Sequence, residues 1–284
     1  MIVVTGATGQ LGRLVIAALL KTVPASQIVA AVRTPAKAAD LAALGVLVRQ
    51  ADYAQPATLV SAFAGAEKLL LISSSEVGQR LVQHQAVIAA AKQAGVKLIA
   101  YTSLLHADTS PLGLAGEHRD TEAALAASGL PFVVLRNGWY TENYTASIPP
   151  ALAHGALLGS AQDGRIASAA RADYAEAAAA VMTRDDQAGK IYELAGDDTY
   201  TLTQFAAEVA AQSGKPVIYK DLPEADFKAA LIGAGLPDYV AALLSDSDAG
   251  AAKGGLFDDS RSLSALIGRP TTPLKAVVAD ALKG

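Results

Sequence analysis

Three features are missing from this sequence of 284 residues, and each absence excludes a class of function. There is no cysteine, which excludes disulfides, thiolate metal sites and a thiol nucleophile. There is no basic excess, because 23 lysines and arginines stand against 27 aspartates and glutamates, so the charge predicts no nucleic-acid partner. No apolar run reaches the roughly 18 residues that span a membrane, and the apolar start lacks a basic leader region. We therefore expect a cytoplasmic protein with no metal site and no membrane partner; the oligomeric state is not predicted.

Apolar residues, by contrast, are plentiful. They make up 52% of the chain, enough for the core of one large domain with a smaller lobe. Short β-branched or leucine-rich runs alternate with alanine- and leucine-rich helical stretches. The expected strands are Met1–Val4, Ile28–Val32, Val46–Gln50, Leu69–Ile72, Leu98–Thr102 and Phe132–Leu135. This alternation, with almost continuously apolar strands, predicts a Rossmann-type α/β fold: a doubly wound parallel sheet with helices on both faces.

The pattern changes after Pro149 and Pro150. A helix is expected at Asp173–Met182 and a late strand at Lys190–Leu194, followed by mostly helical sequence. Those later helices are expected at Thr203–Ser213, Glu224–Ala234, Tyr239–Leu244 and Pro273–Leu282. We therefore expect a nucleotide-binding core over residues 1–195 and a smaller, mostly helical substrate lobe over residues 196–284, interleaved with the core.

A glycine-rich turn follows the first expected strand. Its residues are Gly6, Ala7, Thr8, Gly9, Gln10, Leu11 and Gly12, with the spacing G-x-x-G-x-x-G. In a strand–turn–helix context the first glycine permits a sharp turn, the second a close approach to a pyrophosphate, and the third close helix packing. The free N–H groups of the helix N-terminus then face the phosphates. The turn therefore predicts a bound dinucleotide, rather than an ordinary glycine-rich loop.

The end of the second strand indicates which dinucleotide. NAD-binding proteins usually place an acidic residue about 20 residues past the turn, on the ribose 2′-OH. Here no acid precedes Asp40, and the strand is followed by Arg33 and then Lys37. A guanidinium suits a 2′-phosphate by charge and by its planar fork of donors, which favours NADP. The alternative is that Arg33 is only a solvated surface residue.

Two further loops fit the same site. Asp52 follows the third strand, where its carboxylate could accept from an adenine amino group or merely cap the loop. Ser73, Ser74 and Ser75 close the fourth strand, at the carboxyl edge of a parallel sheet where ligands bind. They permit close approach of a cofactor, or form a polar turn.

These residues resemble the NmrA-like branch of the atypical short-chain dehydrogenases, and in particular its bacterial quinone-reducing members. Besides the glycine turn and Arg33, the resemblance lies in Leu135–Tyr144, Arg171–Tyr174, Tyr192–Gly196 and Phe257–Ser260, and it covers essentially the whole chain. It implies an NADP-binding Rossmann core, a small C-terminal lobe and a substrate cleft between them. The cofactor contacts it implies, beyond Gly6–Leu11, Arg33 and Ser73–Ser75, are Gly138, Trp139, Tyr140, Thr141, Glu142, Asn143 and Arg171.

The Tyr-x-x-x-Lys pair of ordinary short-chain dehydrogenases is missing, since none of the nine tyrosines has lysine four residues later. The helix after the fifth strand carries His118 and Glu122 instead, four residues apart and hence on one face. His118 could be a general acid supported by the carboxylate. The alternative is a polar pair on the helix surface.

The missing Tyr-x-x-x-Lys pair narrows the class of compound that can accept the hydride. Hydride delivery to a ketone leaves an alkoxide, whose conjugate acid is about as weak as water (pKa ~15.7). A quinone leaves a phenolate-like oxygen with a pKa of roughly 10, which solvent can protonate. We therefore expect an NADPH-dependent quinone reductase in which Tyr140 and Asn143 hold the nicotinamide or the acceptor, although these residues and Trp139 could instead pack between the lobes. The alternatives are a non-catalytic NADP(H) sensor and a nucleotide-sugar epimerase or reductase, the latter weakened by the missing pair.

Overall fold

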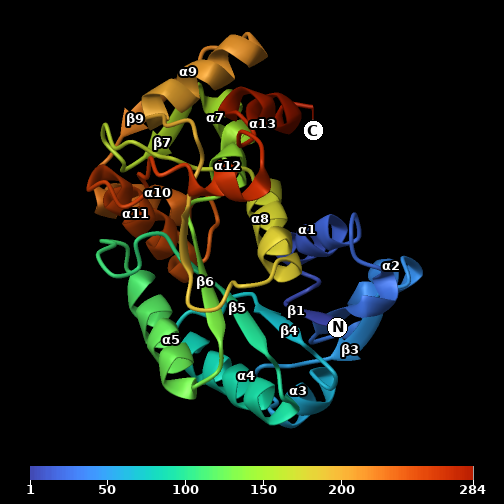
Figure 1. The fold of residues 1–284 in the computed structure, drawn as a ribbon. Helices are drawn as coiled ribbons and strands as arrows, with labels where there is room; N and C mark the ends of the chain where they lie inside the picture. Colours follow the sequence, from blue (N-terminus) through green and yellow to red (C-terminus); the bar gives the residue numbers. More distant parts are fainter. Residues whose placement is uncertain (284) are drawn as a thin grey trace. The chain divides into compact units, whose positions relative to one another are not determined.

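The structure, a computed structural model, describes residues 1–283 and divides into two compact units (Figure 1). Unit 1 comprises Met1–Ala107, Gly116–Asn137 and Arg171–Tyr192. Unit 2 comprises Asp108–Ala115, Gly138–Ala170 and the chain from Glu193 onward. The units alternate along the chain, because the connection after the sixth strand already belongs to unit 2.

A seven-stranded sheet, ordered β3-β2-β1-β4-β5-β6-β8, confirms the expected doubly wound α/β fold. Its strands are β1 (Ile2–Thr5), β2 (Ile28–Val32), β3 (Leu47–Gln50), β4 (Lys68–Leu71), β5 (Leu98–Leu104), β6 (Phe132–Asn137) and β8 (Ile191–Leu194). Strands β1 to β6 pair in parallel, with Val3 opposite Val29 on one side and Leu69 on the other. The strand order reverses at β1, so the chain leaves this interior strand at the switch point where doubly wound folds bind ligands.

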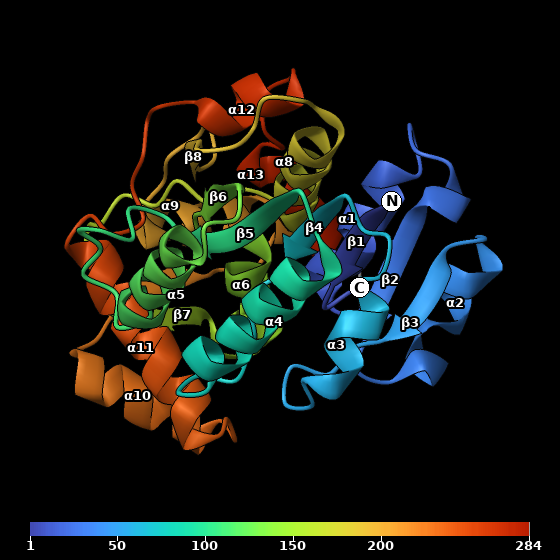
Figure 2. The same ribbon diagram turned by 60° about the horizontal axis from the view of Figure 1, so that its bottom comes forward.

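Helices cover both faces of the sheet in unit 1. They are α1 (Gln10–Leu19), α2 (Ala39–Ala43), α3 (Ala57–Ala62), α4 (Arg80–Ala94), α5 (Ala115–Ser128) and α8 (Arg171–Thr183), with short 3-10 turns η1 (Ala25–Gln27) and η2 (Pro35–Ala38). Figures 1 and 2 show α1 and α8 on one face and α3, α4 and α5 on the other. Every residue of β2 and of β5 is buried, as expected for parallel strands covered on both sides.

Unit 2 is mostly helical but contains a small sheet that the sequence pattern did not reveal. Strands β7 (Ala156–Gly159) and β9 (Ile218–Asp221) pair in parallel. The helices are α6 (Thr141–Thr145), α7 (Ile148–His154), α9 (Leu202–Ser213), α10 (Glu224–Gly233), α11 (Asp238–Ala252), α12 (Ser262–Ile267) and α13 (Leu274–Ala281). Helix α9 starts with a capping box, in which the Thr201 side chain accepts from the Gln204 N–H and the Gln204 side chain accepts from the Thr201 N–H.

Helix α11 runs well beyond the expected Tyr239–Leu244, as far as Ala252. The polar stretch Asp246-Ser247-Asp248 lies within this helix, where Ser247 and Asp248 are buried. Among residues 1–283 no helix is long and apolar enough to cross a membrane.

Candidate functional site

The glycine turn has the geometry that its three glycines require. Gly6 adopts φ +59, a left-handed conformation that L side chains rarely adopt. Its carbonyl oxygen accepts the Gly9 N–H at 2.9 Å, which closes the turn. A Cβ at Gly12 would lie 2.7 Å from Cα of Ala7 and closer still to the Gly6 carbonyl oxygen. The turn is therefore wound so tightly against α1 that glycine is required at position 12.

The N-terminus of α1 fits a phosphate. Gly9 at its N-cap offers no side-chain hydrogen bond, and no acidic residue lies in the first turn. The positive end of the helix dipole and the first N–H groups are thus left to an external anion. These observations on the chain's own residues show that a dinucleotide pyrophosphate is compatible with the turn.

Arg13 stabilises this turn through hydrogen bonds, a role that the sequence analysis did not predict. Its guanidinium donates from Nε to the Thr8 carbonyl at 3.2 Å and from Nη2 to the Lys37 carbonyl at 2.8 Å. It also forms an ion pair with Asp40. The first acid after the turn is therefore engaged by Arg13. A basic residue directly after the third glycine was the available signal.

Arg33 directly follows β2 and is well exposed, with its Nη1 2.9 Å from Oε1 of Glu76. An exposed ion pair of this kind contributes little to stability, so the guanidinium can exchange Glu76 for another anion at small cost. The role of Arg33 at a 2′-phosphate stays a prediction.

The serine loop after β4 is held by its backbone. The Ser73 N–H donates to Thr102 Oγ1 at 2.9 Å, and the Ser74 N–H donates to His84 Nε2 at the same distance. The Ser74 carbonyl accepts from Arg80 Nε at 2.6 Å, whereas Ser75 is exposed. The loop is thus both a polar turn and a fixed platform at the carboxyl edge of the sheet.

Asp52 caps its own loop. Its carboxylate accepts from the Ala54 N–H at 3.0 Å and from the Gln55 side chain at 3.1 Å. The loop-capping interpretation therefore describes what this carboxylate does in the structure, and a contact with adenine stays a prediction.

His118 is not on the helix surface and does not pair with Glu122. It is 5% exposed, and its Nδ1 lies 2.7 Å from the Tyr101 hydroxyl. Glu122 instead accepts from Ser103 at 2.5 Å and forms an ion pair with Arg136 at 2.7 Å. The sequence pattern went wrong because it could not show that this polar face of α5 packs on β5 and β6. Burial, and secondarily Arg80 and His84, lowers the pKa of His118 to about 3, so the imidazole is neutral and a poor proton donor near pH 7.

A buried polar cluster surrounds His118 and reaches the serine loop. Because His84 Nε2 accepts the Ser74 N–H, this ring carries its proton on Nδ1, which donates to Thr121 Oγ1 at 3.0 Å. Burial, and secondarily Arg80, lowers the pKa of His84 to about 4. The cluster therefore holds Ser74 in place through a neutral histidine.

Asn137, the last residue of β6, was also missed. It is 6% exposed, and its Oδ1 has no hydrogen-bond partner within the described part of the chain. Such a buried acceptor at the carboxyl edge of the sheet fits a ligand that donates a hydrogen bond. A polar residue at the end of an apolar strand was the signal for it.

The segment after Asn137 belongs to unit 2 and is fixed mainly by its backbone. The Gly138 N–H donates to the Leu194 carbonyl at 2.7 Å. The Thr141 N–H donates to the Ala169 carbonyl at 2.9 Å, and its hydroxyl lies 2.8 Å from that of Ser168. Tyr140 and Glu142 are partly exposed, as is Arg171 at the start of α8 in unit 1. Their expected contacts with a cofactor stay predictions.

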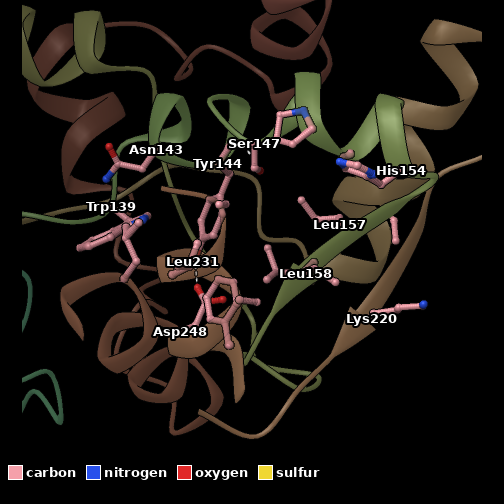
Figure 3. Close-up of a pocket in the computed structure, with 18 residues that line it drawn as sticks. Trp139, Asn143, Tyr144, Ser147, His154, Leu157, Leu158, Lys220, Leu231 and Asp248 are labelled. Atoms are coloured by element: carbon pink, nitrogen blue, oxygen red, sulfur yellow. Dashed lines mark hydrogen bonds between the residues drawn. The ribbon is translucent and has the colours of Figure 1, made fainter. Parts of the chain in front are cut away.

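Unit 2 contains a pocket of about 460 Å³ (Figure 3). Trp139 and Asn143, both expected site residues, lie on one side of it, and His154 and Lys220 lie on the opposite side. Its lining is mainly apolar and comes from α6, α7, β7, β9, α10 and α11, with Leu202 from the start of α9. A pocket of this size holds a small organic molecule.

Asp248 is the buried carboxyl group in the wall of this pocket. Its Oδ1 accepts from the Tyr144 hydroxyl at 3.3 Å (Figure 3). Its Oδ2 accepts from the Ser160 N–H at 3.0 Å. Burial raises the pKa of Asp248 to about 6, although both hydrogen bonds oppose the shift. Burial and the adjacent carboxyl group also raise the pKa of the Tyr144 hydroxyl.

A parallel sheet of this order, with a glycine turn directly after β1, is typical of dinucleotide-binding proteins. Residues 1–275 match the NmrA-like family, and the chain belongs to it. It is 67% identical to Quinone oxidoreductase 2 of Escherichia coli (strain K12) over 274 residues, which is 96% of each chain.

Solved structures agree with this membership. The crystal structure of the NADPH-dependent quinone oxidoreductase of Escherichia coli complexed with NADPH matches with a TM-score of 0.97 and 66% identity, covering 99% of this chain and 100% of that one. The triphenylmethane reductase of Citrobacter sp. complexed with NADP(H) matches with a TM-score of 0.95 and 40% identity, covering 99% of this chain and 100% of that one.

Proposed function

We propose that this chain is an NADPH-dependent quinone oxidoreductase. The observation that carries the proposal is the tight glycine turn at the uncapped N-terminus of α1, in a chain 67% identical to a quinone oxidoreductase along nearly its whole length. NADPH supplies a hydride when bound, and a quinone accepts it.

The chain's own residues bind and orient. In this proposal Gly6 to Gly12 and the helix dipole of α1 hold the pyrophosphate, and Arg33 holds the 2′-phosphate. Ser73–Ser75, Asp52 and Arg171 contribute further contacts to the cofactor. Asn137 offers its buried Oδ1 to an N–H of the ligand.

Little acid–base chemistry is required of the protein. The acceptor takes up a hydride, that is two electrons and a proton, and a second proton from solvent completes the hydroquinone. After hydride transfer the negative charge rests on a phenolate-like oxygen of the reduced quinone. The conjugate acid of this oxygen has a pKa of roughly 10, so no strong local acid is needed. His118 stays out of the mechanism because it is buried and neutral in its polar cluster. Tyr140 and Asn143 are proposed to orient the reacting groups.

The test is NADPH oxidation with para-benzoquinone, compared with NADH and with ketones. We expect turnover with the quinone and a preference for NADPH over NADH. Arg33→Ala should raise the KM for NADPH by about tenfold or more and leave that for NADH nearly unchanged, since only NADPH carries the extra phosphate. Lys21→Ala, which removes another exposed cation of unit 1, is the matched control.

Tight NADPH binding without turnover of any quinone would contradict the proposal and favour the non-catalytic sensor. A cytoplasmic location is part of the proposal, supported by the absence of cysteine, which suits a reducing compartment. Cell fractionation with an antibody against the chain would test it.

A further inference from the structure

One face of α10 forms a wall of the unit 2 pocket. Phe227, Ala230 and Leu231, followed by the C-cap residue Ala234, line it at the spacing i, i+3, i+4, i+7 that places side chains on one side of a helix. Small alanines alternate there with a phenylalanine and a leucine, which leaves room beside the large side chains. Ala229 lies on the same helix but off this face, and it is exposed.

Other parts of the lining are also apolar. Strand β7 contributes Leu157 and Leu158, and α11 contributes Leu244. The buried polar groups of the lining are Tyr144 and Asp248, which point toward one another (Figure 3). A buried carboxyl group with both oxygens engaged disfavours an anion beside it and tolerates a neutral molecule.

The same pocket includes residues of the expected cofactor segment. Trp139 and Asn143 lie within Gly138–Asn143, and they line the pocket on the side opposite His154 and Lys220. The pocket therefore starts at a segment assigned to the reaction and extends between α10 and β7 toward exposed residues. Its volume of about 460 Å³ lies within the range that binds drug-sized ligands and exceeds the need of an unsubstituted quinone ring.

We propose that this pocket is the acceptor site and selects a neutral quinone with an apolar substituent, which lies between α10 and β7. The inference rests on the proposed quinone reductase function. The ring lies at the Trp139 end, where aromatic stacking is available, and the substituent is buried by the leucines of β7 and by the apolar face of α10.

The first test compares three acceptors with NADPH: para-benzoquinone, decyl-substituted benzoquinone and a naphthoquinone sulfonate. The wild-type chain should have the highest kcat/KM with the decyl compound and the lowest with the sulfonate. Ala230→Phe fills the pocket and should lower kcat/KM for the decyl compound at least about tenfold, with para-benzoquinone changed less than about threefold. Ala229→Phe, the matched control, should change neither. Equal losses for both acceptors, or no loss for either, would overturn the proposal.

A second measurement needs no turnover. Trp139 is the sole tryptophan of the chain and lies in the pocket, so its fluorescence reports occupancy directly. With NADP+ present, the decyl compound should quench it saturably, and Ala230→Leu, a milder substitution, should weaken the apparent affinity at least about threefold. Turnover of para-benzoquinone without saturable quenching by the decyl compound would overturn the pocket assignment and leave the quinone reductase function standing. Saturable quenching by the decyl compound without turnover of any quinone would leave the pocket assignment standing and overturn the quinone reductase function.

Discussion

The two units bury charged and polar groups for different purposes. In unit 1, Arg80, His84 and His118 are buried in a cluster with close partners and hold the backbone of Ser74. In unit 2, Asp248 is buried in the wall of a cavity, beside space that protein atoms do not fill. The cluster fixes a loop, whereas the carboxyl group borders an open pocket. The comparison teaches that added atoms should be damaging at the closely packed positions of unit 1, whereas added atoms in the pocket of unit 2 should change selectivity.

The largest expected effect comes from adding atoms at the glycine turn. Gly12→Val would force a side chain against the backbone of Gly6 and Ala7, so NADPH affinity should fall by about 100-fold or more, with a stability loss of roughly 1–3 kcal/mol. Fluorescence titration with NADPH measures the first and urea unfolding the second. Gly116→Ala in α5 is the control, because a Cβ there meets nothing; it should stabilise by about 0.5–1 kcal/mol. Affinity for NADPH within twofold of wild type in Gly12→Val would contradict this description of the turn.

Acid should weaken unit 1. The pKa of His84 is lowered to about 4 and that of His118 to about 3, both mainly by burial, so the unfolded chain binds more protons below pH 6.5. Stability should therefore be full above pH 6.5 and fall as the pH drops from 6.5 toward 4, by up to roughly 1.4 kcal/mol per pH unit for each histidine. Urea unfolding at a series of pH values measures the slope. His84→Gln, whose amide oxygen can still accept the Ser74 N–H, should flatten it. An unchanged slope in His84→Gln would refute the assignment of the effect to this ring.

Asp248 should affect the pH dependence of stability in the opposite sense to His84 and His118. Its pKa is raised to about 6, mainly by burial and further by Asp221, so the folded chain binds more protons than the unfolded chain between pH 4 and 6. Its contribution to stability is present at low pH and is lost as the pH rises through 6. Asp248→Asn should therefore stabilise the chain at pH 7–8 and steepen its loss in acid. In the Asp248→Asn variant the amide oxygen can still accept the hydrogen bond from the Ser160 N–H, and the amide nitrogen can donate to the Tyr144 hydroxyl. If Asn instead weakened the chain at pH 8, the carboxyl group would be a net stabiliser and the contrast between the units would fail.

The smallest expected effect concerns the pair on the surface of unit 1. Glu76 lies beside Arg33 and competes with any phosphate that the guanidinium binds. Glu76→Gln should lower the KM for NADPH by about twofold and leave the KM for NADH unchanged, because an exposed pair contributes only about 0–1 kcal/mol. Steady-state kinetics at low and high salt would check this, and an equal change for both cofactors would argue against it.

The sequence predicted best those features whose physics is local. The glycine turn and the position of Arg33 depend on a few adjacent residues, and the alternation of strands and helices follows from the apolar runs. The pocket depends on Trp139, Leu157, Leu231 and Asp248, which are far apart in the chain, so no local pattern could indicate it. The environment of His118 was missed for a related reason: a polar helix face gives no sign that it will be buried.

The interleaving of the two units also constrains how the chain is built. Unit 1 receives its last segment, which includes α8 against α1, only when the chain has been made as far as Tyr192. When the glycine turn and strands β1 to β5 have emerged from the ribosome, unit 1 is still incomplete. Most of the chain must therefore emerge before the first unit can close its core during synthesis. For the same reason neither unit can be cut out as one continuous fragment, and exchanging the acceptor pocket between relatives requires replacing several separate segments.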